Sequence, residues 1–206
     1  MSATRRGRLI ALEGIDGCGK STQAALLADR LDARLTFEPG ATPLGTALRQ
    51  LVLNPALPDV DARAEALLMA ADRAQHTAEV IEPLLVEGTS VVTDRFTGST
   101  LAYQGFGRQL DLTALEALNQ LATAGTTPDV NVLIDVPVEV ARARMEPARA
   151  DRLERLGQAF QRRVHDGYRQ LAESDPGAWV IVDGTGDVAV VAERVRRAVA
   201  DRLDHD

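Results

Sequence analysis

A single lysine stands among the 23 basic residues of this chain. It is Lys20, and it lies in the run Gly14-Ile15-Asp16-Gly17-Cys18-Gly19-Lys20-Ser21, whereas every other basic position is arginine. The run fits G-x-x-x-x-G-K-[ST], a loop whose backbone N–H groups surround the phosphates of a nucleotide. Arginine replaces lysine poorly there, because a compact ammonium on a flexible stem must reach the terminal phosphates. The spacing therefore predicts a nucleotide-phosphate site.

The positions of this loop have different predicted tasks. The glycines let the backbone approach the phosphates, Lys20 spans the terminal phosphates, and the Ser21 hydroxyl binds Mg²⁺. Thr22 either contacts the α-phosphate or makes a local hydrogen bond at the start of the following helix. The residues expected to hold the nucleotide are Gly14, Ile15, Asp16, Gly17, Cys18, Gly19, Lys20, Ser21 and Thr22.

The loop by itself leaves several functions open. It occurs in GTPases, in ATP-driven motors and in small-molecule kinases. A GTPase usually reads its base with Asn-Lys-x-Asp, and a chain whose sole lysine is Lys20 cannot contain that element. A motor is expected to be longer than 206 residues. We therefore favour a kinase for a small phosphorylated or hydroxylated substrate.

Four further segments carry side chains suited to binding an acceptor. They are Phe-Glu-Pro-Gly-Ala-Thr-Pro-Leu-Gly at 37–45, Ala-Asp-Arg-Ala-Gln-His at 71–76, Asp-Arg-Phe-Thr-Gly-Ser-Thr-Leu-Ala-Tyr-Gln-Gly at 94–105, and Asp-Arg-Leu-Glu at 151–154. With the loop, in this order and spacing, they resemble bacterial thymidylate kinase over about 9–172. The resemblance implies a P-loop NTPase fold, the cofactors ATP and Mg²⁺, and transfer of the γ-phosphoryl group of ATP to thymidine 5′-monophosphate (dTMP), which gives dTDP.

The resemblance assigns the acceptor phosphate and the metal to particular residues. Arg95 grips the acceptor phosphate, and Asp94 organises the metal and its waters, with a structural ion pair as the alternative reading of this dipeptide. Arg49 resembles a second phosphate ligand, although an exposed helical arginine is a serious competitor. Glu38, in the turn before Arg49, is counted with the acceptor site.

The base and the sugar are assigned in the same way. Arg73 matches the arginine that reads a thymine carbonyl, which suits a planar guanidinium. Thr100 and Gln104 match residues that line the base, and a glutamine amide can pair with the N3–H and O4 edge. Tyr103 packs near the deoxyribose and helps to exclude a 2′-hydroxyl, or else packs in the core. Asp16 resembles a carboxylate near the 3′-hydroxyl and the phosphates.

Two positions depart from the family pattern. The usual turn reads Arg-Glu-Pro-Gly-Gly-Thr, whereas this chain has Phe37 and Ala41 in place of the arginine and a glycine. The family commonly has an aromatic side chain that stacks on thymine at the position of Met69. Our hypothesis is compensation, in which Phe37 supplies the stacking face and Met69 fills the space beneath it. Phe37 as a strand-end residue of the core has equal weight.

A cluster of arginines follows later in the chain, at 142, 144, 149 and 152. We interpret 143–155 as a lid that closes over ATP, against the alternative of a solvated helix face partly neutralised by Glu146, Asp151 and Glu154. In the family, a catalytic arginine lies either in the phosphate loop or in the lid. This loop has Gly17 where the first class has arginine, so the resemblance places it in the lid, with Arg149 as first choice and Arg152 as second.

These residues need elements that bring them together. Apolar runs of strand length alternate with helical stretches, which is typical of an α/β fold with a mainly parallel sheet. We expect strands at 9–13, 34–37, 90–93, 130–135 and 179–182. We expect helices at 20–31, 44–53, 62–86 with a kink at Pro83, 112–124 after a break at 105–107, from Pro137 onward, and 188–203. Together with the resemblance, this predicts a single domain over 1–206 in which helices flank a five-stranded parallel sheet.

Composition restricts the partners and the compartment. A formal net charge of −7 and an aromatic content of 3% argue against general nucleic-acid binding. No apolar run approaches the roughly 20 residues of a membrane span. The lone Cys18 excludes an internal disulfide and fits a reducing compartment, so we expect a cytoplasmic protein.

The resemblance also implies a homodimer, with the alanine- and leucine-rich helices around Leu67 and Leu115 as candidate interfaces. Two rival functions stay open at this point. One is a kinase for another nucleoside monophosphate or a deoxynucleoside, and the other is a non-catalytic nucleotide sensor. Asp94, Arg95 and the lid arginines argue against the sensor, because binding ATP requires none of them.

Overall fold

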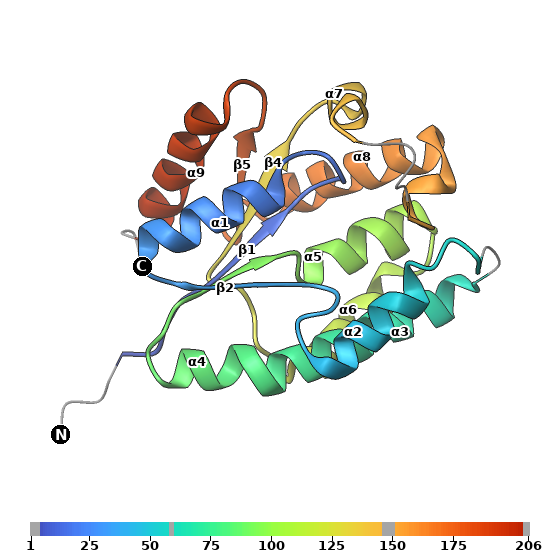
Figure 1. Ribbon diagram of the computed structural model, residues 1–206, viewed down its shortest axis with the longest axis horizontal. Helices are drawn as coiled ribbons and strands as arrows, with labels where there is room; N and C mark the ends of the chain where they lie inside the picture. The colour runs from blue at the N-terminus through green and yellow to red at the C-terminus, as the bar shows by residue number, and fades with distance from the viewer. Residues whose placement is uncertain (1–4, 58–59, 146–150, 204–206) are drawn as a thin grey trace.

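The computed structural model describes residues 5–57, 60–145 and 151–203. Within them five strands form one parallel sheet in the order β2-β3-β1-β4-β5, which confirms the predicted fold class (Figure 1). The strands are β1 (Leu9–Glu13), β2 (Arg34–Phe37), β3 (Val91–Asp94), β4 (Val130–Asp135) and β5 (Trp179–Asp183). Register pairs Leu12 with Asp94 and Phe37 with Asp94, so β1, β2 and β3 end at one edge of the sheet. In an open α/β sheet, ligands bind at that edge.

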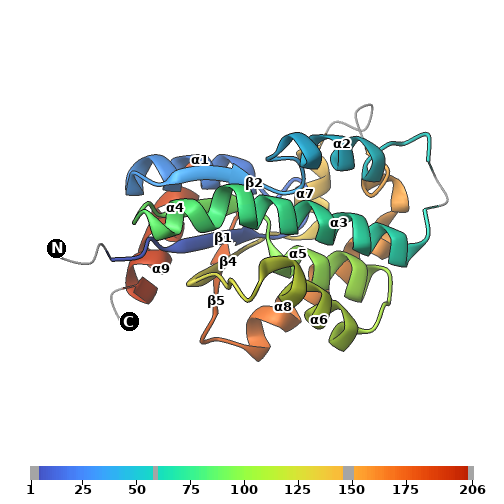
Figure 2. The same ribbon diagram turned by 90° about the horizontal axis from the view of Figure 1, so that it is seen from below.

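Two helical layers cover the sheet (Figures 1 and 2). On one face α1 (Lys20–Leu31) packs against α9 (Val188–Leu203). The helices of the other face are α3 (Ala62–His76), α4 (Glu82–Val86), α5 (Thr97–Thr100), α6 (Leu112–Thr123) and α8 (Gln158–Ser174). The shorter α2 (Pro43–Val52) lies along α3, and α7 (Val138–Ala143) follows β4. The direction of each crossover decides its face, because parallel connections are right-handed.

Sequence signals explain why these helices begin where they do. The Thr42 side chain accepts a hydrogen bond from the backbone N–H of Gly45, and Pro43 occupies the first turn of α2. The Asp111 side chain accepts from the backbone N–H of Ala114 at the start of α6, and Asp61 caps α3 in a similar way. These side chains satisfy amide groups that have no partner inside the helix.

The helical segments differ from the expectations in three places. The predicted kink in 62–86 is a wide helical turn, η1 (Thr77–Ile81), that precedes Pro83, because proline lacks the N–H that would continue the regular helix. The expected break at 105–107 belongs instead to η2 (Leu101–Gly107). A Cβ on Gly105 would lie 2.4 Å from Leu112 and one on Gly107 would lie 2.6 Å from Phe160, so these glycines permit close packing. No element was predicted for α8.

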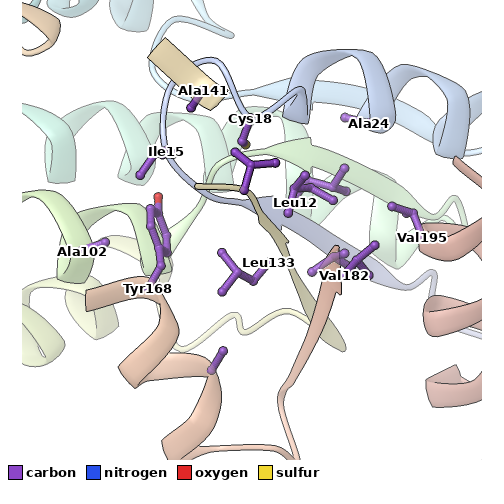
Figure 3. Packing of buried hydrophobic residues seen from close by; sticks show 14 of the residues in the cluster. Leu12, Ile15, Cys18, Ala24, Ala102, Leu133, Ala141, Tyr168, Val182 and Val195 are labelled. Carbon is purple, nitrogen blue, oxygen red and sulfur yellow. The ribbon is translucent and has the colours of Figure 1, made fainter. Parts of the chain in front are cut away.

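The largest core cluster joins the phosphate loop to the sheet. Ile15 and Cys18 of the loop are buried with Leu12 of β1 and Leu133 of β4, and Figure 3 shows them facing the same interior as Tyr168 of α8. The loop is therefore anchored by apolar burial, and Gly14 is buried with it, whereas Gly17 and Gly19 are partly exposed. Among the described residues, no helix combines the length and hydropathy that crossing a membrane requires.

Candidate active site

The phosphate loop has the predicted strand–loop–helix context, between β1 and α1. Gly14, Gly17 and Gly19 have φ of 142°, 80° and 101°, a region that favours glycine. A Cβ on Gly17 would come within 2.2 Å of the Ala141 carbonyl oxygen. The loop thus requires glycine for backbone conformation and for its close approach to α7, and it directs the N-terminus of α1 toward the cleft.

The first two side chains of α1, Lys20 and Ser21, have different hydrogen-bond partners. Lys20 is 5% exposed and donates from Nζ to the Ile15 carbonyl at 2.9 Å. Ser21 Oγ donates to Asp94 Oδ2 at 2.5 Å. Asp94 Oδ1 is buried and accepts no hydrogen bond from the residues that the structure describes. A hydroxyl beside a carboxylate with an unused oxygen suits Mg²⁺, which takes few protein ligands and completes its shell with water and phosphate.

Arg95 lies at the junction between this loop and the next pocket. Its φ of 74° is rare for a residue other than glycine and is typical of functional sites. Nη1 donates to the Gly14 carbonyl at 3.1 Å, and Nη2 pairs with the Asp16 carboxylate. Burial alone would raise the pKa of the Asp16 carboxyl, but the charges of Arg95 and Lys20 outweigh it and lower that pKa to about 2. Asp16 is thus ionised and fixes the arginine.

Two pockets meet at this pair. The larger one runs along the phosphate loop and is lined by Gly17, Gly19, Lys20, Ser21, Thr22 and Asp94 among others. The smaller one is lined by Leu53, Met69, Asp72, Arg73, Thr100, Tyr103 and Gln104 among others. Asp16, Glu38, Arg49 and Arg95 border both. A phosphoryl group held in the first pocket therefore faces a ligand held in the second across this shared border.

Arg73 forms the rigid back of the smaller pocket. Its Nε donates to Glu38 Oε2 at 2.9 Å, its Nη1 to Thr100 Oγ1 at 2.6 Å, and its Nη2 to the Phe96 carbonyl at 2.8 Å. A further Nη1 contact reaches Asn119 Oδ1 at 2.8 Å. Every guanidinium nitrogen thus donates to a protein oxygen, so Arg73 organises the pocket wall rather than pointing free donors into it.

Glu38 is likewise held by protein groups. One oxygen of its buried carboxylate pairs with Arg73, and the other lies 2.9 Å from His76 Nδ1. The second nitrogen of His76 contacts Thr36 Oγ1 at 2.6 Å. Arg49 differs from this set, because its Nη1 donates to the Pro39 carbonyl at 2.8 Å and it forms no ion pair within the described parts of the chain. Of the two arginines at the shared border, Arg49 therefore has fewer interactions with protein groups than Arg95.

The structure brings Met69, Thr100, Tyr103 and Gln104 into one pocket, but it places Phe37 elsewhere. Phe37 is 45% exposed at the end of β2 and lines the phosphate-loop pocket. Leu53, Leu153 and Met69 supply the apolar wall of the smaller pocket instead. The arrangement therefore gives no support to compensation by Phe37, and its exposure also argues against the core reading.

The lid arginines have different surroundings. Arg149 and Glu146 lie outside the described residues. Arg152 is 3% exposed, where it donates from Nη2 to Glu65 Oε2 and from Nε to the Val52 carbonyl, so the solvated-face reading does not hold for it. Arg144 donates to the carbonyls of Cys18 and Gly184, beside the phosphate loop.

Sequence reasoning missed a buried cluster behind Arg95. The Glu13 carboxylate, which has no solvent exposure, accepts from the Phe96 N–H at 2.9 Å, from Ser99 Oγ at 2.7 Å and from Tyr168 OH at 3.0 Å. The same two hydroxyls contact Arg95 Nη1 at 3.1 and 3.2 Å. The spacing of Phe160, Val164 and Tyr168 at four-residue intervals could have revealed α8, and with it Tyr168.

The fold and this site define a P-loop phosphotransferase, with a nucleotide-phosphate cradle and an adjoining pocket that Arg49, Arg73 and Arg95 help to line. Comparison with known proteins narrows the class. Residues 12–195 match the thymidylate kinase family. The thymidylate kinase of Desulforudis audaxviator is 47% identical over an alignment that covers 95% of this chain and 93% of that protein. The enzyme of Trichlorobacter lovleyi is also 47% identical, over 94% of this chain and 97% of its own length.

A solved structure agrees with the sequence relatives. The crystal structure of thymidylate kinase from Ehrlichia chaffeensis superposes with a TM-score of 0.77 at 29% identity, over 94% of this chain and 99% of that one. The chain belongs to the thymidylate kinase family. The resemblance inferred from the phosphate loop and the four further segments is confirmed.

Proposed function

We propose that this protein transfers the γ-phosphoryl group of ATP to dTMP and releases dTDP and ADP, a step in the supply of dTTP. The observation that carries the proposal is the junction at Asp16 and Arg95, where the phosphate-loop pocket meets a second pocket lined by arginine, threonine, glutamine and apolar side chains. Family membership points to the same reaction. Neither a different acceptor nor a nucleotide sensor has a comparable observation in its favour.

The donor side acts through position and charge. The loop amides and Lys20 hold the terminal phosphates of ATP, and Thr22 contacts the α-phosphate, a role supported by its exposure at the start of α1 and its position in the lining of the pocket. Ser21 and Asp94 would hold Mg²⁺, which supplies charge neutralisation between the phosphates. Arg144 donates to the Cys18 carbonyl of the loop and adds positive charge there.

The acceptor side needs no strong base, because a phosphate monoester is already an anion. Arg95 and Arg49 hold the acceptor phosphate in line with the donor, and Asp16 keeps Arg95 in place. The Nε of Arg95 has no protein acceptor among the described residues, so this donor is available to a phosphate oxygen. A lid arginine, of which Arg149 is our first choice, completes the charge stabilisation. The burial of Arg152 favours a structural role for that residue.

The pyrimidine is held by the smaller pocket. Thr100 Oγ1 accepts from Arg73, so the Thr100 hydroxyl proton is left to meet a base carbonyl. Gln104 faces the imide edge, and Met69 packs against the ring. Tyr103 packs beside the sugar and excludes a 2′-hydroxyl; its lining of the smaller pocket and the hydrogen bond from its hydroxyl to Asp16 at 2.6 Å support this role.

We infer that two copies associate through α3 and α6 and that the protein works in the cytoplasm. Leu67 of α3 is 60% exposed and Leu121 of α6 is 80% exposed, whereas Leu115 of α6 is 3% exposed and belongs to the core. Exposed leucines on two helices that pack together fit a protein contact. Light scattering at micromolar concentration should give twice the 22.1 kDa chain mass, and Leu121→Glu should lower it; a monomeric wild type would contradict the inference.

An acceptor panel tests the proposed reaction. Initial rates are measured with ATP and Mg²⁺ and with dTMP, dUMP, dCMP or GMP as acceptor. We expect the highest kcat/KM with dTMP and negligible turnover with dCMP and GMP. Equal rates with dTMP and GMP would refute the assignment of the smaller pocket to a pyrimidine.

A further inference from the structure

Glu65 is a buried carboxylate that the proposed reaction does not use. It lies on α3 one turn before Met69 and two turns before Arg73, so all three side chains share the helix face that borders the smaller pocket. Its side chain has no solvent exposure. A carboxylate that is buried in this way needs hydrogen-bond donors from the protein, and the residues that donate are the ones whose position it can influence.

Three donors converge on this carboxylate from two other parts of the chain. Gln104 donates from Nε2 to Oε1 at 2.9 Å. Arg108 and Arg152 each donate from Nη2 to Oε2 at 2.7 Å. Burial alone would raise the pKa of the Glu65 carboxyl, but these hydrogen bonds outweigh it and lower the pKa below its usual range. Glu65 is therefore ionised and can only accept.

An acceptor-only partner fixes the orientation of the Gln104 amide. The NH₂ group must face Glu65, because the opposite orientation would set the amide oxygen against a carboxylate. Gln104 lines the smaller pocket, and no described residue donates to its Oε1. The second amide N–H and Oε1 are thus left as a neighbouring donor and acceptor for a ligand.

A neighbouring donor and acceptor match only some pyrimidine edges. Thymine and uracil present a carbonyl oxygen next to the N3–H, which complements this pair. Cytosine presents an amino group next to an unprotonated N3, so a donor would face a donor and an acceptor would face an acceptor. The direction of the Gln104 amide consequently decides between an imide and a cytosine.

We propose that Glu65 sets the acceptor selectivity of this enzyme by holding the Gln104 amide in the orientation that pairs with a pyrimidine imide. The inference rests on the proposed function and deepens it. Glu65 is a positioning residue, because it contacts Gln104 and not the acceptor. A purely structural Glu65, which ties Arg152 and the end of α2 to α3, would alter stability without altering the choice of base.

Glu65→Gln separates these two roles, because the new amide can face Gln104 with either its oxygen or its nitrogen. kcat and KM are measured for dTMP and dCMP. We expect the ratio of kcat/KM for dTMP to that for dCMP to fall about 10-fold, the effect of one lost oriented hydrogen bond, mainly through a higher KM for dTMP. A folded variant whose ratio stays within about twofold of wild type, a change below the worth of one hydrogen bond, would overturn the proposal.

Arg108→Met is the matched control. It removes one arginine from Glu65 while keeping the bond between Glu65 and Gln104, and Arg108 lies outside the smaller pocket. It should lower stability and leave the dTMP-to-dCMP ratio unchanged. A fall in the ratio as large as that of Glu65→Gln would mean that the effect is general loosening, and would contradict the proposal.

A spectroscopic arm covers the case in which Glu65→Gln does not fold. In ¹⁵N-labelled wild-type protein, the Gln104 side-chain signal is assigned by its loss in Gln104→Leu. One Nε2 proton should exchange slowly with solvent, and the other should shift when dTMP is added. Two amide protons that both exchange rapidly and do not shift when dTMP is added would overturn the proposal.

These experiments also separate the inference from the proposed function. If the wild type prefers dTMP but the tests of Glu65 fail, only the inference is refuted. If the wild type does not distinguish dTMP from dCMP, the proposed function is refuted as well.

Discussion

The phosphate-loop pocket and the smaller pocket are built in opposite ways. Much of the first is lined by the phosphate loop and the start of α1, which are consecutive in the chain, and residues of other elements, among them Phe37 and Asp94, line the rest. The second is assembled from several elements, and three of its charged side chains, Glu38, Asp72 and Arg73, are buried, with Glu38 and Arg73 forming an ion pair. Lys20 has one strong hydrogen bond, to a neighbouring carbonyl, whereas Arg73 uses every nitrogen on protein oxygens.

This difference separates function from stability. A residue with few protein partners can be removed with little effect on folding but with a direct effect on its ligand. A residue that neutralises buried charge supports the fold and the site together. We therefore expect substitutions on the donor side to change rates, and substitutions on the acceptor side to change stability as well.

The largest effect is expected for Lys20→Ala. Loss of the ammonium at the terminal phosphates should reduce kcat by about 10²–10³-fold, the scale for removing one preorganised charge-stabilising group. The urea midpoint should stay close to that of wild type. Arg30→Ala, which removes an exposed cation from the other end of α1, is the control and should leave both quantities unchanged. Unchanged turnover in Lys20→Ala would contradict every kinase reading of this loop.

The next effect is on the fold and comes from Arg73→Met. This change leaves the Glu38 carboxylate buried without its main partner, so the free energy of unfolding should fall by about 3–5 kcal/mol. Urea denaturation at pH 7 measures it. Adding Glu38→Gln removes the stranded charge and should recover part of the loss. If Arg73→Met were as stable as wild type, the contrast between the two pockets would fail.

The smallest effect concerns Asp72 and appears as a pH dependence. Burial, together with the negative charge of Glu38, raises the pKa of Asp72 to about 6, from an ordinary 3.8. Between these values the folded protein retains a proton that the unfolded chain has lost, so stability falls as pH rises from about 4 to 6 and then levels. Asp72→Asn keeps an oxygen for the Gly40 N–H and should lack this decline.

Urea midpoints of both proteins at intervals from pH 4 to 8 provide the measurement. The stability of wild type relative to Asp72→Asn should decrease up to about pH 6 and stay constant above pH 7. Parallel curves over the whole range would show that the Asp72 carboxyl titrates normally.

The contrast between the two pockets also explains which parts of the fold and the site could be predicted from the sequence. The phosphate loop is local in sequence, so Gly14 to Ser21 revealed the strand, the loop and the helix at once, and the alternation of apolar runs revealed the sheet. Glu65 and Glu13 were missed because a lone glutamate in an alanine-rich helix or after a strand shows its role only when distant donors reach it. Phe37 was misplaced for a related reason, since its exposure depends on β2 lying at the edge of the sheet.

Titration calorimetry with each substrate alone tests the division into donor and acceptor pockets most directly. A non-hydrolysable ATP analogue and dTMP are titrated separately into wild type, Lys20→Ala and Gln104→Leu. We predict that Lys20→Ala weakens the ATP analogue at least about 10-fold and leaves dTMP affinity unchanged, and that Gln104→Leu does the reverse. Loss of dTMP binding in Lys20→Ala, or of ATP-analogue binding in Gln104→Leu, would contradict the account.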